Sequence, residues 1–277
     1  MAARKFDEAA KESCILMERE LILMIIREQA DAFVLIAQHD HGFVSGEFAQ
    51  GLKDACYGEA GDGRREDTVL AAYEHDRSWI GLDAVPLWND QANRPYSFMD
   101  YPLAPKLGSY RKGLDELERM NPYAALLASL HYASFFVKTE EAEGEMFYRH
   151  ERERQKRLRD QIQTPGGTVE RHFKLLQLCD DLSLYVCLNE PGTAKEAEHP
   201  WFRSGFARSE AFHSLGDRPL VGRWLDERTM TVDGTPFREA FVLHLRSKRV
   251  AKDRIAEHGI ALAYAEAPWT MQEIRVE

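Results

Sequence analysis

Apolar residues recur at helical spacing in residues 68–80, and the resulting stripe contains a carboxylate. Read at about 100° per residue, the stripe runs from Val69 through Asp76 to Trp79. His75 lies beside this stripe. A buried carboxylate without a partner is so costly that it usually loses its charge or binds a cation. The pattern therefore predicts a helix with an inward-facing Asp76 that needs a cationic partner.

Two further segments place a polar side chain inside an apolar stripe. In residues 168–188 the stripe includes Asp180, whereas Asp181 falls in a polar register one position later. In residues 38–52 the stripe includes His41. We therefore expect Asp180 and His41 to point inward and Asp181 to point outward.

The remaining pattern up to about residue 190 is typical of a mostly helical core. We predict a strand at 21–27, a helix from Asp31 to about residue 53, a helix over 122–138 and a charged helix over 140–163. Opposite charges alternate along the charged helix, which favours a solvated face over a nucleic-acid patch. Residues 81–105 hold four prolines among aromatic residues, which predicts a long loop covering the cation that partners Asp76.

Short strands dominate the pattern after residue 221. Strands are predicted at 229–232, 237–245 and 271–276, with Asp233-Gly234 as a hairpin signal and a helix over 251–265. We expect them to join the strand at 21–27 in one small antiparallel sheet against the helical core, about 31–190. The predicted fold is therefore a single α+β domain spanning 1–277, with its β-containing C-terminal part at about 221–277.

Composition limits the classes of partner. The chain has 277 residues, 44% of them hydrophobic, enough for a full-sized core. Its formal net charge of -10 argues against nucleic acid as the main partner, because neutralising phosphates needs a concentrated basic face. A small anionic substrate remains compatible if a metal supplies positive charge. The four cysteines lack CxxC spacing and no signal peptide or membrane span is apparent, so we expect a cytoplasmic protein without a membrane partner.

Short motifs surround the inward-facing residues. They are Gln38-x-x-His41 followed by Ser45-Gly46, Glu74-His75-Asp76 followed by Trp79, Ser129-x-His131, Cys179-Asp180-x-Leu182-Ser183-Leu184 and, near the C-terminus, Ala261-x-x-Tyr264-Ala265-x-Ala267. The order of a His, a His-Asp doublet and a final Asp resembles the HD-domain superfamily of metal-dependent phosphohydrolases. More narrowly, the motifs look like a bacterial family of unknown function within it. The resemblance covers most of the chain and implies an HD-like helical core and a metal, but no particular substrate.

The resemblance implies that His41, His75, Asp76 and Asp180 bind a divalent transition metal, either Mn, Fe, Co, Ni or Zn. The implied reaction is hydrolysis of a phosphate ester of a small molecule or nucleotide by a metal-bound water, whose pKa the metal lowers. Two other functions stay open: a non-catalytic metal- or ligand-binding regulatory scaffold, and an HD-type di-iron oxygenase, which needs further histidines between the doublet and the last Asp. A His-Asp doublet alone is common and is usually a structural ion pair or a chance neighbour pair on a helix surface, so the metal prediction depends on the further inward ligands and the resemblance.

Three more residues are candidates for catalysis. His131, on the inner face of its helix, suits a further ligand, a phosphate contact or a hydrogen-bonded core histidine. Several nucleotide-hydrolysing HD enzymes carry a Glu shortly after the doublet, which this sequence lacks. Of the nearby carboxylates Glu74 and Asp83, Asp83 is the better candidate for general acid or base, because it starts the long loop. Arg94 is a candidate phosphate clamp, with a surface arginine over aromatic rings as the alternative and Lys106 next in line. His39 is expected in solvent or at the mouth of the site.

Overall fold

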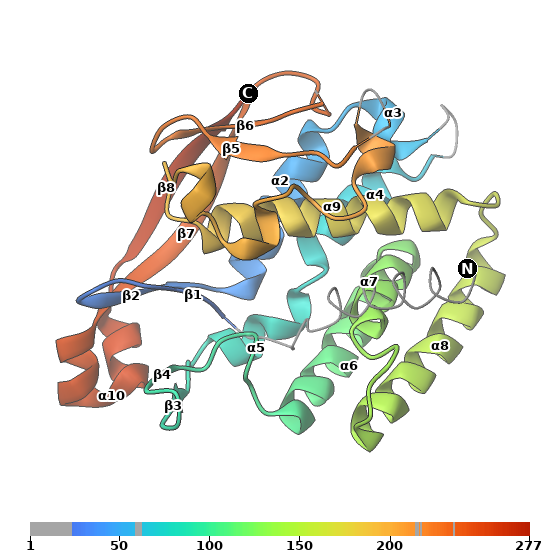
Figure 1. Ribbon diagram of the computed structural model, residues 1–277. Coiled ribbons are helices and arrows are strands. Elements are labelled where there is room, and N and C mark those ends of the chain that lie inside the picture. The colour runs from blue at the N-terminus through green and yellow to red at the C-terminus, as the bar shows by residue number, and fades with distance from the viewer. Residues whose placement is uncertain (1–23, 59–62, 214–215, 217, 235) are drawn as a thin grey trace, which may run out of the picture.

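The computed structural model describes residues 24–58, 63–213, 216, 218–234 and 236–277. It has an α+β architecture in which a curled six-stranded sheet lies along one side of a larger helical layer (Figure 1). Of the predicted strand at 21–27, residues 21–23 lie outside the described residues. The α+β class expected from the pattern is therefore confirmed.

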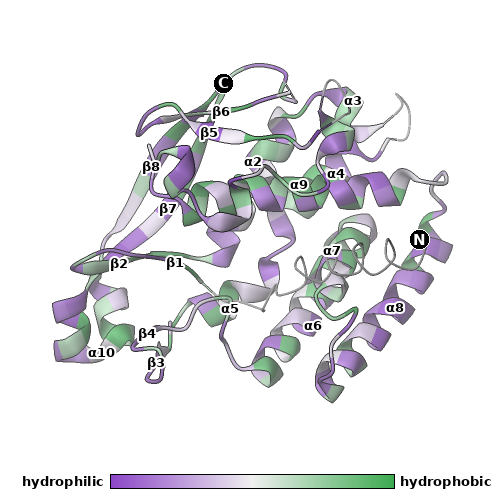
Figure 2. Cartoon of the chain, viewed as in Figure 1, coloured by the Kyte–Doolittle hydropathy of each residue, from purple (hydrophilic) through white to green (hydrophobic). Residues whose placement is uncertain are grey.

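The helical layer contains the segments that carry the inward-facing polar residues. Its helices are α2 (Gln38–Gly51), α3 (Asp54–Tyr57), α4 (Arg65–Glu74), α5 (Ile80–Asp83), α6 (Leu103–Met120), α7 (Pro122–Ser134), α8 (Ala142–Ile162) and α9 (Thr168–Leu188), and the 3-10 turn η1 (Arg77–Trp79) joins α4 to α5. Further 3-10 turns lie at Lys195–Ala197, Pro200–Phe202 and Glu210–Phe212. Figure 2 shows hydrophobic residues concentrated on α7 and hydrophilic residues along α8.

The sheet joins strands from the beginning and the end of the described chain. Its strands are β1 (Ile25–Glu28), β2 (Ala32–Ile36), β5 (Gly222–Trp224), β6 (Thr229–Val232), β7 (Phe241–Ala251) and β8 (Trp269–Val276), in the order β1-β2-β7-β8-β6-β5. β6 and β8 pair in parallel, so the sheet is mixed and not antiparallel as predicted. The expected hairpin around Asp233-Gly234 is also wrong. After helix α10 (Lys252–Glu266), β8 returns between β7 and β6 and separates them.

The helix predicted from Asp31 starts later than expected. Residues Ala32–Ile36 form β2 and are all buried, which suits a strand covered on both faces. Asp31 does not cap a helix, because its carboxylate accepts hydrogen bonds from Arg249 and its carbonyl accepts one from the backbone N–H of Lys252. The helix proper, α2, begins at Gln38.

The predicted loop at 81–105 contains regular structure. It begins in α5, includes the small hairpin of β3 (Trp88–Asn89) and β4 (Arg94–Pro95), and ends in the first turn of α6, a helix that the pattern did not predict. The hairpin lies near α10 (Figure 1). Its Trp88 ring meets Phe33 of β2 edge-on, with centroids 6.2 Å apart. The segment therefore packs on the sheet and is not a free-standing loop.

A large apolar cluster fills the space between the helices and the sheet, and a smaller one lies beneath α10. In the described part of the chain, no helix combines the length and apolar character that crossing a membrane requires.

Candidate metal centre

Three helices bring the four predicted ligands together. α2 carries His41 and α9 carries Asp180, while His75 and Asp76 follow directly after the last turn of α4. All four residues are buried, with exposed fractions between 1% and 6%. The burial predicted from the apolar stripes is confirmed, and the polar ends of these side chains meet inside the helical layer.

Two glycines on α2 allow α4 to approach closely. A Cβ atom at Gly46 would lie 2.2 Å from the ring of Tyr73, and one at Gly42 would lie 3.0 Å from the carbonyl oxygen of Tyr73. Any larger residue would push the two helices apart. Because the helices pack this tightly, His41 and His75 meet edge to face with ring centroids 5.4 Å apart.

The ligand atoms converge on one small volume. Nε2 of His41 lies 3.0 Å from Oδ1 of Asp180 and 3.7 Å from Oδ2 of Asp76. Nε2 of His75 lies 3.5 Å and 3.6 Å from the same two oxygens. In each of the triplets His41, His75, Asp180 and His75, Asp76, His131, the potential ligand atoms all lie within 4.8 Å of one another. These residues could hold a metal ion.

Hydrogen bonding fixes the orientation of His75. Its Nδ1 donates to the carbonyl oxygen of Ala72, at 2.8 Å, because a carbonyl can only accept. In the neutral ring the lone pair therefore sits on Nε2, the atom that faces the carboxylates. Within the described residues this buried Nε2 has no hydrogen-bond partner. A second interaction that holds the ring while one nitrogen remains available is typical of metal-binding histidines.

His41 is oriented by α9. The hydroxyl of Ser183 donates to the backbone carbonyl of Asp180 at 2.9 Å and lies 2.8 Å from Nδ1 of His41. Since its single proton is used, Ser183 accepts a hydrogen bond from Nδ1–H, which leaves the lone pair of His41 on Nε2. That lone pair faces Oδ1 of Asp180 at 3.0 Å. Two acceptors at this distance need a cation between them, either a proton or a metal ion.

The electrostatics of the cluster favour positive charge. Burial disfavours the charged form of His75, but the carboxylates of Asp76 and Asp180 outweigh it and raise the pKa of His75 to about 9. Burial likewise opposes ionisation of Asp180, yet the facing imidazoles of His41, His75 and His131 hold its pKa well below the usual range. The two pKa shifts have the same cause. The buried carboxylates are stabilised by positive charge on the imidazoles that face them.

Two residues that the sequence did not single out as partners orient Asp76. The indole Nε1 of Trp79 and the hydroxyl of Tyr132 each donate to Oδ1 of Asp76, at 3.2 Å. Oδ2 therefore points toward His41 and His75. The sequence contained only a weak indication of these two hydrogen-bond donors: Trp79 lies on the same apolar stripe as Asp76, and Tyr132 directly follows His131.

His131 joins the cluster from α7. It is 3% exposed, its Nε2 lies 3.9 Å from Oδ2 of Asp180, and its ring meets that of His75 with centroids 5.2 Å apart. The other histidines considered for a di-iron site lie elsewhere. His150 is on the surface of α8, and His172 bonds to the hydroxyl of Tyr123 and the carbonyl of Tyr57.

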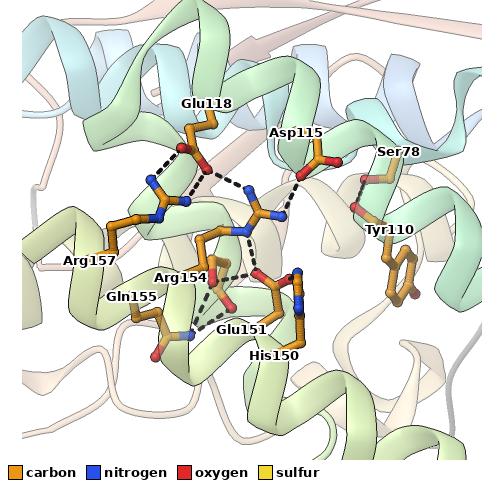
Figure 3. Close-up of polar contacts among 10 residues, drawn as sticks. Ser78, Tyr110, Asp115, Glu118, His150, Glu151, Arg154, Gln155 and Arg157 are labelled. Carbon is orange, nitrogen blue, oxygen red and sulfur yellow. Dashed lines mark hydrogen bonds and ion pairs between the residues drawn. The ribbon is translucent and has the colours of Figure 1, made fainter.

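A buried ionic network holds α7 in place. Ser129, two residues before His131, donates to Oε2 of Glu151 at 2.8 Å, and the same oxygen accepts from Nε of Arg154 at 3.0 Å. Figure 3 shows Arg154 reaching on to Asp115 and Glu118 of α6. The prediction that α8 is solvated is therefore wrong for the side that faces α6 and α7, where Glu151 and Arg154 are buried.

The other predicted residues are spread more widely. Asp83, 5% exposed, accepts a 2.6 Å hydrogen bond from the backbone N–H of Gln38, the first residue of α2. Burial raises the pKa of Asp83 well above its usual value, more than this hydrogen bond lowers it. Arg94 lies on β4, is 43% exposed and has its guanidinium 4.0 Å from Asp100; it contributes no atom to the contacts around His75.

The outward orientation predicted for Asp181 is wrong, because this residue is 2% exposed. Helix α9 is covered on nearly every side from Leu175 to Cys187, so a polar register does not guarantee exposure there. His39 is half-buried and lies in the first turn of the same helix as His41.

The fold and the site together define an α+β protein with a buried histidine and carboxylate cluster at a helix junction. Residues 24–252 match the family model described as "Protein of unknown function (DUF3891)", and the chain belongs to this family. The match includes all of His41, His75, Asp76, His131 and Asp180. No curated protein and no solved structure matches the chain.

Proposed function

We propose that this protein binds a divalent transition metal through His41, His75, Asp76 and Asp180 and hydrolyses a phosphate ester of a small molecule or nucleotide. The observation that carries the proposal is the short contact between His41 Nε2 and Asp180 Oδ1, which lie 3.0 Å apart with room between them for one cation, a proton or a metal ion. A divalent cation between them would satisfy both atoms and both neighbouring ligands.

The donor set fits such an ion. Imidazole nitrogens combined with carboxylate oxygens suit Mn, Fe, Co, Ni or Zn. Each histidine donates its Nδ1–H to a neighbouring oxygen, so that Nε2 is available as a ligand. The helices α2, α4 and α9 supply the ligands in the order that the HD resemblance implies, and α7 adds His131. We include an HD-like helical core in the proposal for this reason.

The bound ion and the three remaining candidate residues have distinct proposed roles. A bound divalent ion would supply a Lewis acid that polarises the phosphoryl group and lowers the pKa of water. His131 would contact a phosphoryl oxygen or complete the ligand set. Asp83, kept protonated by burial, would give its proton to the alcohol oxygen that leaves when the P–O bond breaks. Arg94 remains a proposed contact for the substrate anion.

Metal analysis followed by an ester screen tests the proposal. The purified protein should carry about one equivalent of a transition metal and turn over at least one phosphomonoester or phosphodiester when loaded with Mn, Fe, Co, Ni or Zn. The His75→Ala variant should lose metal and turnover, whereas His150→Ala, which changes a surface histidine, should keep both.

Other results would favour the alternatives. A metal-loaded protein that hydrolyses no ester but binds a nucleotide or metabolite would indicate a regulatory scaffold. Consumption of O₂ by the Fe(II) form would indicate an oxygenase. Absence of metal from both the wild type and the reloaded protein would exclude the proposed centre.

A further inference from the structure

Two buried oxygen atoms beside the candidate metal centre lack hydrogen-bond partners among the described residues. They are Oε1 of Gln38 and Oδ1 of Asp83, on side chains that are 3% and 5% exposed. Leaving a buried polar atom unpaired costs roughly 1–3 kcal/mol, so folded proteins keep few of them. An unpaired acceptor in this position therefore points to a group that binds there.

Both side chains are associated with the first turn of the helix that carries His41. Gln38 precedes His41 by three residues, so their side chains lie on the same face of α2, roughly 5–6 Å apart at Cβ. Asp83 is joined to the same turn, because its Oδ2 accepts the backbone N–H of Gln38. Asp83 is also close enough to Asp76 to be influenced by its charge. The two oxygens are thus linked to the candidate metal centre through the first turn of α2.

The hydrogen-bonding character of Gln38 Oε1 and Asp83 Oδ1 favours a hydroxyl group as the bound partner. The amide oxygen of Gln38 can only accept a hydrogen bond. Asp83 is held in its neutral form by burial, so its free oxygen can share a proton with a partner. A hydroxyl both donates and accepts and can therefore pair with either residue, whereas an alkyl group can pair with neither.

We propose that Gln38 and Asp83 bind a hydroxyl group on the alcohol part of the substrate, so that the preferred ester is a polyol phosphate. This inference rests on the proposed phosphohydrolase function, because it assigns the substrate class of that site. A site built to hydrogen-bond a hydroxyl discriminates strongly against an analogue that lacks it, since its own polar groups then lose their partner.

A matched pair of esters tests the inference. Glycerol 3-phosphate and propyl phosphate share the phosphate and the three-carbon chain and differ in the hydroxyl groups. The metal-loaded wild type should show a kcat/KM roughly ten- to hundredfold higher for glycerol 3-phosphate. Each hydrogen bond to the hydroxyl is expected to change kcat/KM by about one factor of ten, and one or two such bonds can form. The near-isosteric Gln38→Met variant should reduce this preference to about threefold or less.

The control is Gln50→Met, which changes an exposed glutamine at the other end of the same helix and should keep the wild-type preference. Because each preference compares two esters on one protein preparation, partial unfolding of a variant does not affect it. Metal content, measured on every sample, should be the same in the wild type and both variants.

Calorimetric binding of the two esters separates this inference from the proposed function. If the protein hydrolyses neither ester but binds glycerol 3-phosphate at least tenfold more tightly, and Gln38→Met removes that difference, the inference holds and the hydrolase proposal fails. Equal affinities and equal kcat/KM values in the wild type, no binding of either ester, or an unchanged preference in Gln38→Met would each overturn the inference.

Discussion

Asp180 faces one ring nitrogen of His41 directly and is linked to the other through Ser183. Oδ1 of Asp180 lies 3.0 Å from Nε2 of His41, and the backbone carbonyl of Asp180 accepts the hydrogen bond of the Ser183 hydroxyl that contacts Nδ1. One turn of α9 therefore sets both the position and the tautomer of a side chain on α2. This arrangement orients the proposed ligands through contacts within the protein itself, which reduces the cost of binding an ion.

The neighbouring aspartates of α9 offer a matched test of the metal site. We expect Asp180→Asn to lose the metal, because an amide binds a transition metal far more weakly than a carboxylate. Asp181→Asn should keep full stoichiometry, although Asp181 is equally buried. Elemental analysis after metal loading and desalting measures both, with thermal melting to show that each variant is folded. Equal metal content in the two variants would contradict the assignment of Asp180.

Ser183→Ala should weaken metal binding without removing a ligand. The change deletes the hydrogen-bond partner of His41 Nδ1, and losing such an orienting contact typically lowers metal affinity by roughly ten- to a hundredfold. Ser45→Ala should have a smaller effect, because Ser45 contacts Ser183 and not His41. Competition with a chelator of known affinity gives the dissociation constants. An affinity of Ser183→Ala equal to that of the wild type would show that Ser183 does not orient the ring.

Two arginines on α8 should differ strongly in their effect on stability. Arg154 is 5% exposed and faces Glu151, Glu118 and Asp115, so Arg154→Ala leaves the fully buried Glu151 without its cation and should cost roughly 3–5 kcal/mol. Arg157 pairs with Glu118 at the surface, and Arg157→Ala should cost about 1 kcal/mol or less. Urea unfolding measures both losses (compare Figure 3). A loss below about 1 kcal/mol for Arg154→Ala would contradict the role of this network.

Lys106 should make the protein less stable at neutral pH. Burial lowers the pKa of its amine to about 8, against the usual value of 10.5, despite the carboxylates of Glu141 and Asp100. The folded state therefore disfavours the charged amine, a penalty fully present below pH 8 and lost as pH rises from about 8 to 10.5. Lys106→Met should raise the free energy of unfolding at pH 7 by up to about 3 kcal/mol.

The pH dependence of the stability gained in Lys106→Met identifies its cause. The stability difference between Lys106→Met and the wild type should fade toward pH 10.5, as measured by urea unfolding at a series of pH values. Lys112→Met, on an exposed position of the same helix, should show no such dependence. A difference that stays constant across this range would indicate a packing effect of methionine and not the removal of a buried amine.

Local pattern was sufficient for several parts of this protein. The helices at Pro122–Ser134 and Thr168–Leu188 and the burial of His41, Asp76 and Asp180 follow from apolar periodicity, which depends only on neighbours along the chain. The strand at Ala32–Ile36 was mistaken for a helix, because a short apolar run has no period of its own.

The sequence by itself determined that His41, Asp76 and Asp180 face inward, because the spacing of apolar residues sets the face that each helix buries. Only the tertiary structure decided which of them meet. The close approach of α2 and α4 at Gly42 and Gly46, the burial of Asp181 and the attachment of Asp83 to Gln38 all depend on segments far apart in the sequence. Such contacts reflect the packing of whole elements, which no local spacing encodes.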